Sequence, residues 1–145
     1  MSDLPTYQQT RQIHADCHLC GALGPLRFTL LAPGQVSAEF VGRRQHQGYP
    51  GLIHGGIISS LLDAAMTHCL FSLGHQALTA ELQVRFLAPA PLEMPLLLSG
   101  RLLSQRRHLF QLEAELCEAE RPLARASAKF LLPTRSLRSG SGHGH

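Results

Sequence analysis

The chain has 145 residues, of which 44% are hydrophobic and only 16% are charged, and its formal net charge is +3. This length corresponds to one ordinary domain that can bury a core without metals or disulfides. The mild, scattered positive charge argues against nucleic acid as a partner but suits an anionic small ligand such as a nucleotide-bearing thioester. The low content of charged residues predicts that extra surface is buried against a second copy of the chain.

The N-terminal stretch lacks the apolar run of a secretory signal, so we expect a cytoplasmic protein with reduced cysteines. The apolar run from Gly55 to Leu73 is long enough to suggest a membrane span. Several polar residues interrupt it, namely Ser59, Ser60, Asp63, Thr67 and His68. Such residues are costly in lipid and tolerated in a protein core, so the sequence predicts a soluble protein with no membrane partner.

In chain order, residues 1–26 are expected to form a loosely ordered entry segment with a short helix around residues 7–14. Strands are predicted at 26–32 and 35–41, on either side of the turn Pro33-Gly34. A long helix begins at Gly55 and ends before Gly74, a residue suited to the position after a helix. Further strands are predicted over 77–89, 94–105, 108–118 and 122–132, with short hairpin links.

One long helix therefore stands among strands that do not alternate with helices, which excludes a parallel α/β fold. An antiparallel sheet that covers one helix is the α+β architecture that fits this order. The helix is apolar nearly all round, as expected when a sheet wraps around it. We expect a single domain over residues 27–133, preceded by the entry segment 1–26 and followed by a disordered Gly/Ser/His-rich tail at 134–145.

Polar residues of this helix recur at intervals of three and four, which places them on one narrow stripe: Ser59, Ser60, Asp63 and Thr67. A buried carboxylate must pair, become protonated or take part in chemistry. One interpretation is that Asp63 accepts hydrogen bonds from the neighbouring hydroxyls and only orders the helix. The other is that the stripe faces a ligand or a second subunit.

The sequence His54-Gly55-Gly56 opens the helix, where the first backbone N–H groups have no partner inside the helix. Glycines at this place let a ligand approach the backbone closely, although they also simply fit a tight turn. The donors suit an anion or a carbonyl oxygen that gains charge. Together with Asp63, they indicate acyl transfer to water, in which one group polarises the carbonyl and the other activates water or attacks directly.

The run from His46 to Asp63, in which HGG is followed at a fixed interval by LLD, resembles the hotdog-fold acyl-CoA thioesterases. Its similarity is greatest to the phenylacetyl-CoA (PaaI-like) branch. The segment LTAELQVRFLAPAP at 78–91 is similar to the strand that follows the central helix in that branch. The resemblance covers about residues 17–133 and implies a hotdog fold. It also implies hydrolysis of an acyl-CoA or aryl-acyl-CoA thioester without a cofactor, by a homodimer or homotetramer.

By position, the resemblance implies that Asp63 is the catalytic acid, acting as general base or nucleophile. It implies that the Gly55 N–H holds the thioester oxygen, with His54 beside it, and that Thr79 helps to place the attacking water. In that family the helix-opening loop of one subunit meets the helix acid of the other. The loop from Gln47 to Leu52 and the backbone at Gly56 are then expected to contact substrate.

The chain also departs from the family pattern. Some members carry an Asn six residues before the His, and here Gly48 stands at that position, so Gln47 or His46 would have to supply a polar group. Many relatives have a second acid after the first, but Ala64 follows Asp63, which leaves Glu81 as a lesser candidate. Arg106 and Arg107, at a strand-to-strand turn, are either a solvated hairpin or contacts for the phosphates of coenzyme A.

Cys17 and Cys20 form a C-x-x-C pair with His14 close by, a spacing that suggests zinc. A structural zinc site needs four ligands, and the chain offers no second close pair, so we expect these thiols to pack and expect no metal.

Two rival functions remain open. A hydratase or dehydratase on the same fold would use His46 and Asp63 as an acid–base pair. A non-catalytic hotdog module would bind acyl-CoA and report it to a partner.

Overall fold

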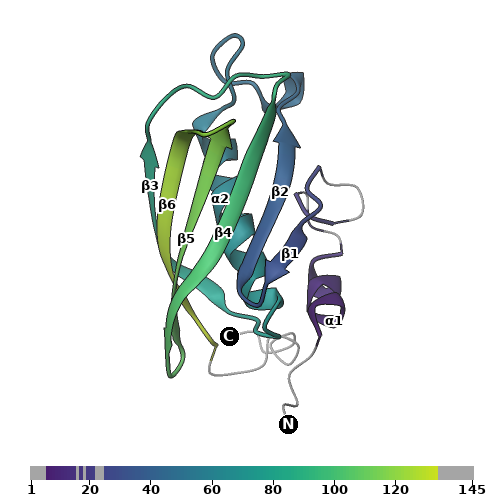
Figure 1. The fold of residues 1–145 in the computed structure, drawn as a ribbon, viewed down its shortest axis with the longest axis vertical. Coiled ribbons are helices and arrows are strands. Elements are labelled where there is room, and N and C mark those ends of the chain that lie inside the picture. The colour runs from purple at the N-terminus through teal and green to yellow at the C-terminus, as the bar shows by residue number, and fades with distance from the viewer. Residues whose placement is uncertain (1–5, 16, 18, 22–24, 134–145) are drawn as a thin grey trace, which may run out of the picture.

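The computed structural model describes residues 6–15, 17, 19–21 and 25–133, so the predicted tail at 134–145 lies outside the described residues (Figure 1). Two short helical turns, α1 (Tyr7–Arg11) and η1 (Gln12–His14), precede the strands. The order continues β1 (Thr29–Ala32), β2 (Gln35–Val41), η2 (Arg44–His46), α2 (Gly55–Phe71), β3 (Leu78–Phe86), β4 (Pro95–Arg106), β5 (Leu109–Glu118) and β6 (Arg121–Leu131). Every predicted strand and the predicted long helix are present, and only the turn η2 was predicted as loop.

The six strands form one antiparallel sheet in the order β1-β2-β4-β5-β6-β3, and the sheet curves around α2 (Figure 1). Alternate residues of the central strands are buried against the helix, including Phe40, Leu98, Phe110 and Phe130. At Gly100 a side-chain carbon would lie 3.1 Å from the backbone of Ala65, so the absence of a side chain lets the helix approach β4 closely. The predicted α+β architecture is confirmed.

Helix α2 begins and ends where the sequence indicates. His54 is its N-cap residue, and Gly74 adopts φ +83°, a conformation that glycine takes at little cost after a helix. The amide of His75 then donates to the carbonyl of Leu70 at 2.9 Å, which closes the last turn. No helix in the described part of the chain is long and apolar enough to cross a membrane.

The described part of the entry segment packs on α2, in contrast to the loose order expected for it. The Tyr7 hydroxyl forms a 2.8 Å hydrogen bond with Nδ1 of the buried His68, and the His14 ring meets Phe71 edge-on. Leu26 has no exposed surface and belongs to the core, so the predicted boundary between residues 26 and 27 divides a packed unit. The entry segment thereby reaches the helix face that carries Asp63.

Candidate active site

A pocket of about 440 Å³ lies between α2, β3 and the entry segment. The helix contributes the predicted polar stripe, β3 contributes two residues and the entry segment three. Its lining comprises Ser59, Ser60, Asp63, Ala64, Thr67, Thr79, Leu82, His14, Cys17 and Leu19. The polar stripe therefore faces an open space at the edge of the sheet, as the second interpretation of the sequence requires.

The Asp63 carboxylate is half-buried and is held from β3. The Thr79 hydroxyl donates a hydrogen bond of 2.6 Å to its Oδ1. The helix hydroxyls bond to backbone instead, because Ser60 donates to the Gly56 carbonyl and Thr67 to the Asp63 carbonyl. The interpretation that the stripe hydroxyls donate hydrogen bonds to the Asp63 carboxylate is therefore wrong. The carboxylate instead faces the pocket.

The opening of α2 offers one backbone donor. The amide of Gly56 donates a hydrogen bond to Nδ1 of His54 at 2.8 Å. This N–H is therefore not available to a ligand, which corrects the expectation that Gly56 contacts substrate through its N–H. No described residue accepts a hydrogen bond from the Gly55 N–H. The donor that remains for a ligand is therefore the Gly55 amide, beside the Phe86 ring of β3.

Asp63 and Gly55 of one chain are too far apart to act on one carbonyl group. Eight residues of helix separate them, which corresponds to about 12 Å at 1.5 Å per residue. A reacting carbonyl must lie about 3 Å from both the attacking group and the oxyanion donor. One carbonyl group could therefore not contact both groups of a single chain.

The loop before α2 is held by its own side chains. Oε1 of Gln47 accepts a hydrogen bond from the Gly51 amide at 2.9 Å, and Nδ1 of His46 accepts one from the Arg43 amide at 2.9 Å. Burial, aided by the charge of Arg43, lowers the pKa of His46. His46 makes no described contact with Asp63 of its own chain, so the acid–base pair of the hydratase interpretation is not formed within one subunit.

Glu81, the lesser acidic candidate, points away from this pocket. It lies on the outer face of the sheet, 3.7 Å from Nζ of Lys129, and accepts a hydrogen bond from Gln83. Arg106 and Arg107 sit at the turn between β4 and β5, at the end of the subunit opposite the loop that precedes α2 (Figure 1). Within one chain they are therefore remote from Gly55.

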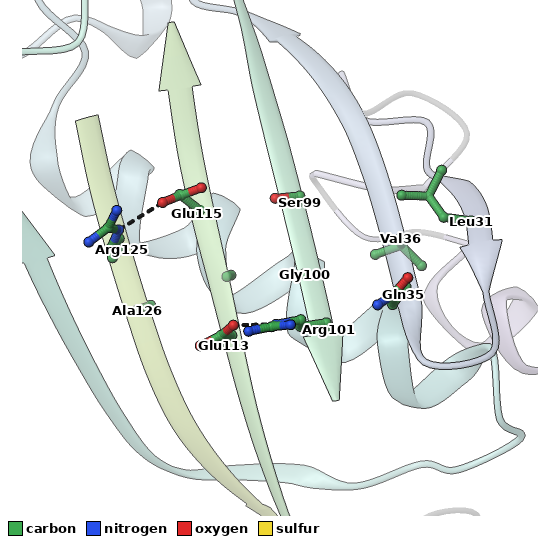
Figure 2. A pocket seen from close by; sticks show the side chains of 11 residues that line it. Leu31, Gln35, Val36, Ser99, Gly100, Arg101, Glu113, Glu115, Arg125 and Ala126 are labelled. Carbon is green, nitrogen blue, oxygen red and sulfur yellow. Dashed lines mark hydrogen bonds and ion pairs between the residues drawn. The ribbon is translucent and has the colours of Figure 1, made fainter. Parts of the chain in front are cut away.

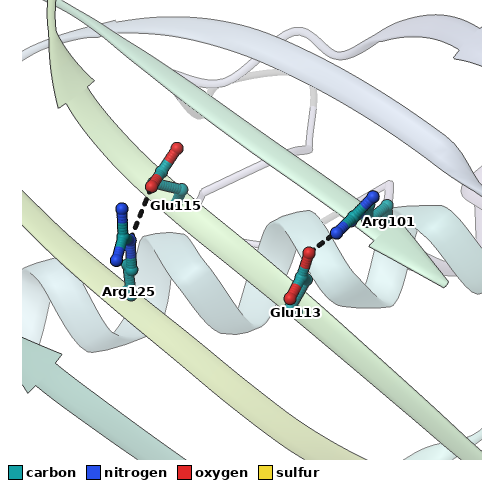
Figure 3. A network of polar contacts seen from close by, with 4 residues as sticks. All are labelled: Arg101, Glu113, Glu115 and Arg125. Carbon is teal, nitrogen blue, oxygen red and sulfur yellow. Dashed lines mark hydrogen bonds and ion pairs between the residues drawn. The ribbon is translucent and has the colours of Figure 1, made fainter. Parts of the chain in front are cut away.

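A larger hollow, of about 570 Å³, lies on the face of the sheet turned away from α2 (Figure 2). Its charged side chains pair with one another, Arg101 with Glu113 and Arg125 with Glu115, the latter at 2.7 Å (Figure 3). The hydrogen bond from Arg125 holds the pKa of Glu115 below its usual value. Each of these charges is paired with another, so none is left unpaired to act on a substrate. The pocket at Asp63 is therefore the better candidate for an active site.

The entry segment adds two titratable pocket residues that the sequence did not place there, His14 and Cys17. Burial lowers the pKa of His14, and the charge of the nearby Asp63 partly offsets this effect. Burial would raise the pKa of Cys17, but hydrogen bonds from the backbone of Cys20, Leu19 and Gly21 and from the Cys20 side chain lower it overall. In the sequence, the C-x-x-C spacing was the signal that could have pointed to these residues. Only the fold shows that Cys17 and His14 line the pocket of Asp63.

An antiparallel sheet around one helix, with a carboxylate on that helix facing a pocket at the sheet edge, defines a hotdog-fold protein. The chain matches the family model of the Thioesterase superfamily over residues 50–124, just over half of its length, and belongs to that superfamily. It is 26% identical over 89 residues to human acyl-coenzyme A thioesterase 13. That match covers 60% of this chain and 64% of the relative, so the chain spans less than two thirds of that protein's length.

Solved structures support the fold assignment. A hypothetical thioesterase from Streptococcus pneumoniae TIGR4, solved with coenzyme A, superposes with a TM-score of 0.69 at 20% identity, covering 73% of this chain and 86% of that one. A mutant of the phenylacetic acid degradation protein PaaI from Thermus thermophilus gives 0.69 at 18% identity, covering 74% and 93%. The predicted hotdog fold is thus confirmed.

The contact between Thr79 and Asp63 predicts a measurable effect on turnover. Replacing Thr79 by valine removes the hydroxyl that holds the carboxylate, and a hydrogen bond to a charged group contributes about 1.5–3 kcal/mol, equivalent to about 10- to 160-fold. We expect kcat of the reaction that uses Asp63 to fall by that factor, with little change in KM. Thr79→Ser keeps the hydroxyl and should retain most activity, and equal losses in both variants would contradict an orienting role.

Proposed function

We propose that this protein is an acyl-CoA thioesterase that hydrolyses acyl-CoA or aryl-acyl-CoA thioesters to the free acid and CoA. The observation that carries this proposal is the Asp63 carboxylate, held by Thr79 and open to a pocket, in a chain of the thioesterase superfamily. The relative named as an acyl-coenzyme A thioesterase and the fold neighbour solved with coenzyme A support the substrate class.

The reaction needs few groups, because a thiolate leaves readily and a thioester carbonyl is already activated. Asp63 takes a proton from water as the water oxygen attacks the thioester carbon, and the Gly55 N–H of a second copy of the chain stabilises the resulting oxyanion. Collapse of the intermediate expels the CoA thiolate, which recovers the proton from Asp63. Direct attack by Asp63, followed by hydrolysis of the resulting anhydride, uses the same groups.

A second copy of the chain completes each site in this proposal. Strand β3 is an edge strand of nine residues with exposed apolar side chains, among them Leu78 and Phe86, which are 51% and 54% exposed. A long edge of this kind is a template for pairing with another strand. Pairing of two β3 edges would cover the pocket at Asp63 and bring the Gly55 loop of the partner subunit towards it. A homodimer is the minimum unit, and a homotetramer is compatible with it.

The remaining parts of the proposal follow from charge and from the cysteines. Arg106 and Arg107 are exposed at the turn between β4 and β5, where the phosphates of a CoA ester bound across two chains would meet them, and His54 lies beside the Gly55 donor. The Gln47 loop would then line the acyl group.

No disulfide joins the four cysteines, which suits a reducing compartment such as the cytoplasm.

The direct test is release of CoA, followed with a thiol reagent, over a panel of short, medium, long and aromatic acyl-CoAs. Turnover of at least one ester confirms the function, and the preferred ester identifies the acyl class. Binding of CoA esters without cleavage would instead support the acyl-CoA-binding module. A change in double-bond absorbance without thiol release would support a hydratase.

A mixing experiment tests the two-chain site. The variants Asp63→Ala and Gly55→Pro each lack one of the two groups, so each homodimer should be inactive. Refolding or coexpressing them together in equal amounts should restore about a quarter of wild-type activity, because half of the dimers are mixed and each mixed dimer has one intact site. A mixture as inactive as its components would show that both groups act within one chain or that the chains do not exchange.

A further inference from the structure

We propose that His14, Cys17 and Cys20 form a binding site for a thiophilic divalent cation, with Zn²⁺ the best fit, in the wall of the Asp63 pocket. The ligand atoms of these three residues lie within 4.8 Å of one another, and all three residues are half-buried. The sequence predicts packing for these cysteines, since a structural zinc site needs four protein ligands and the chain offers no second close pair. The structure instead brings together one imidazole and two thiols, a set that forms zinc sites with three protein ligands and a water molecule.

The spacing between the ligand atoms suits zinc. Sγ of Cys20 and Nδ1 of His14 are 3.5 Å apart. Bonds of about 2.3 Å from zinc to sulfur and about 2.0–2.1 Å to nitrogen, at a tetrahedral angle, place sulfur and nitrogen about 3.5 Å apart. Insertion of the ion therefore requires loss of the thiol protons and closure of the remaining ligand distances, which are all within 4.8 Å. Two thiolates and an imidazole favour Zn²⁺ over the hard cations Mg²⁺ and Ca²⁺.

Two backbone hydrogen bonds link the described residues around the ligands. The Cys17 amide donates to the His14 carbonyl at 3.0 Å, and the Gly21 amide donates to the Cys17 carbonyl at 2.9 Å. A side-chain carbon at Gly21 would collide with the backbone oxygens of Ala15 and Cys17, so this turn requires glycine. The turns bring both cysteines to the same side as His14 before any metal binds, and such pre-organisation favours metal binding.

A fourth ligand would have space on the pocket side. His14 and Cys17 line the same space as Asp63 and Thr79, and the His14 ring also packs edge-on against Phe71. A water molecule on the metal would therefore point into the pocket. The metal would fix the entry segment against α2 and shape the acyl end of the site. Hydrolysis itself is assigned to Asp63, so metal binding and thioesterase activity can be tested separately.

The test is binding of Co²⁺ and Zn²⁺ to the whole 145-residue chain under a reductant that does not bind metals. We expect about one Co²⁺ per chain, with a thiolate-to-cobalt charge-transfer band and the strong visible absorption of tetrahedral cobalt, displaced by Zn²⁺. Cys20→Ser and His14→Gln should weaken binding by more than the roughly 10- to 100-fold that loss of an outer-shell partner costs. Zn²⁺ should also protect Cys17 and Cys20, but not Cys117, from alkylation.

Two controls separate this site from other ligands of the chain. Cys117→Ser leaves the cluster intact and should bind metal as the wild type does. His143→Ala combined with His145→Ala removes imidazoles of the tail and should leave the thiolate band unchanged. The absence of a thiolate band in the reduced wild-type protein, or metal binding that persists in Cys20→Ser and disappears with the tail histidines, would overturn the proposal even if one variant failed to fold.

Discussion

Asp63→Ala is expected to lower kcat for acyl-CoA hydrolysis by at least about 10²-fold, because it removes the group that, in the proposed reaction, takes the proton from water or attacks the thioester. Asp63→Asn is the sharper variant. It keeps the shape of the side chain and still accepts the 2.6 Å hydrogen bond from Thr79, but an amide neither accepts the proton nor attacks. A loss of the same size in both variants, with normal unfolding transitions, would assign the effect to the charge and not to packing.

The measurement is CoA release with the preferred ester, together with binding of that ester to each variant. Because Asp63 is half-buried at the pocket wall, we expect both variants to fold and to bind substrate. Retention of more than a tenth of wild-type turnover in Asp63→Asn would show that Asp63 only shapes the pocket. Loss of binding together with turnover would show instead that the variant has lost the site.

Gly55→Pro is expected to lower kcat by about 10²- to 10³-fold, the usual effect of removing one oxyanion donor. Proline has no backbone N–H, and the first position of a helix is where it is tolerated best. His54 has φ −61° and ψ 136°, an extended conformation that is compatible with a following proline. The substitution therefore deletes one hydrogen atom of the proposed site while leaving the helix start in place.

Gly55→Ala is the matched control, because it retains the N–H. A side-chain carbon at this position would lie 3.6 Å from the Phe86 ring, an ordinary van der Waals contact. We expect nearly normal turnover in Gly55→Ala and similar midpoints of urea unfolding for both variants. Equal activity in the proline and alanine variants would show that the Gly55 amide does not stabilise the transition state.

Local chemistry in the sequence was sufficient to predict most of the architecture. The apolar run that opens at Gly55 and stops before Gly74 predicts α2, and alternation in segments such as β3 predicts the strands, because side-chain periodicity and the conformations of glycine act within a few residues. Antiparallel pairing follows from the short links between strands. The predicted stripe on α2 is real for the same reason, since spacings of three and four residues define one helix face.

The partner of Asp63 required the tertiary structure. The sequence offered hydroxyls on its own helix, but a helical Ser or Thr readily donates to the carbonyl four residues earlier, as Ser60 and Thr67 do. The resemblance singled out Thr79 for placing water, and the fold brings its hydroxyl to the carboxylate itself. That contact joins residues 16 positions apart and depends on how β3 crosses α2.

The sequence by itself thus determined the elements, the α+β hotdog fold and the two residues on which the proposed chemistry rests, Asp63 and Gly55. Only the tertiary structure decided that Glu81 faces the outer side, that the Gly56 amide is committed to His54 and that His14 and Cys17 reach the pocket. The physical reason is the distance along the chain over which each interaction acts. Helix and strand periodicity is local, whereas the docking of the entry segment depends on burial of Leu26 and on the contact of Tyr7 with His68, which lie far apart in the chain.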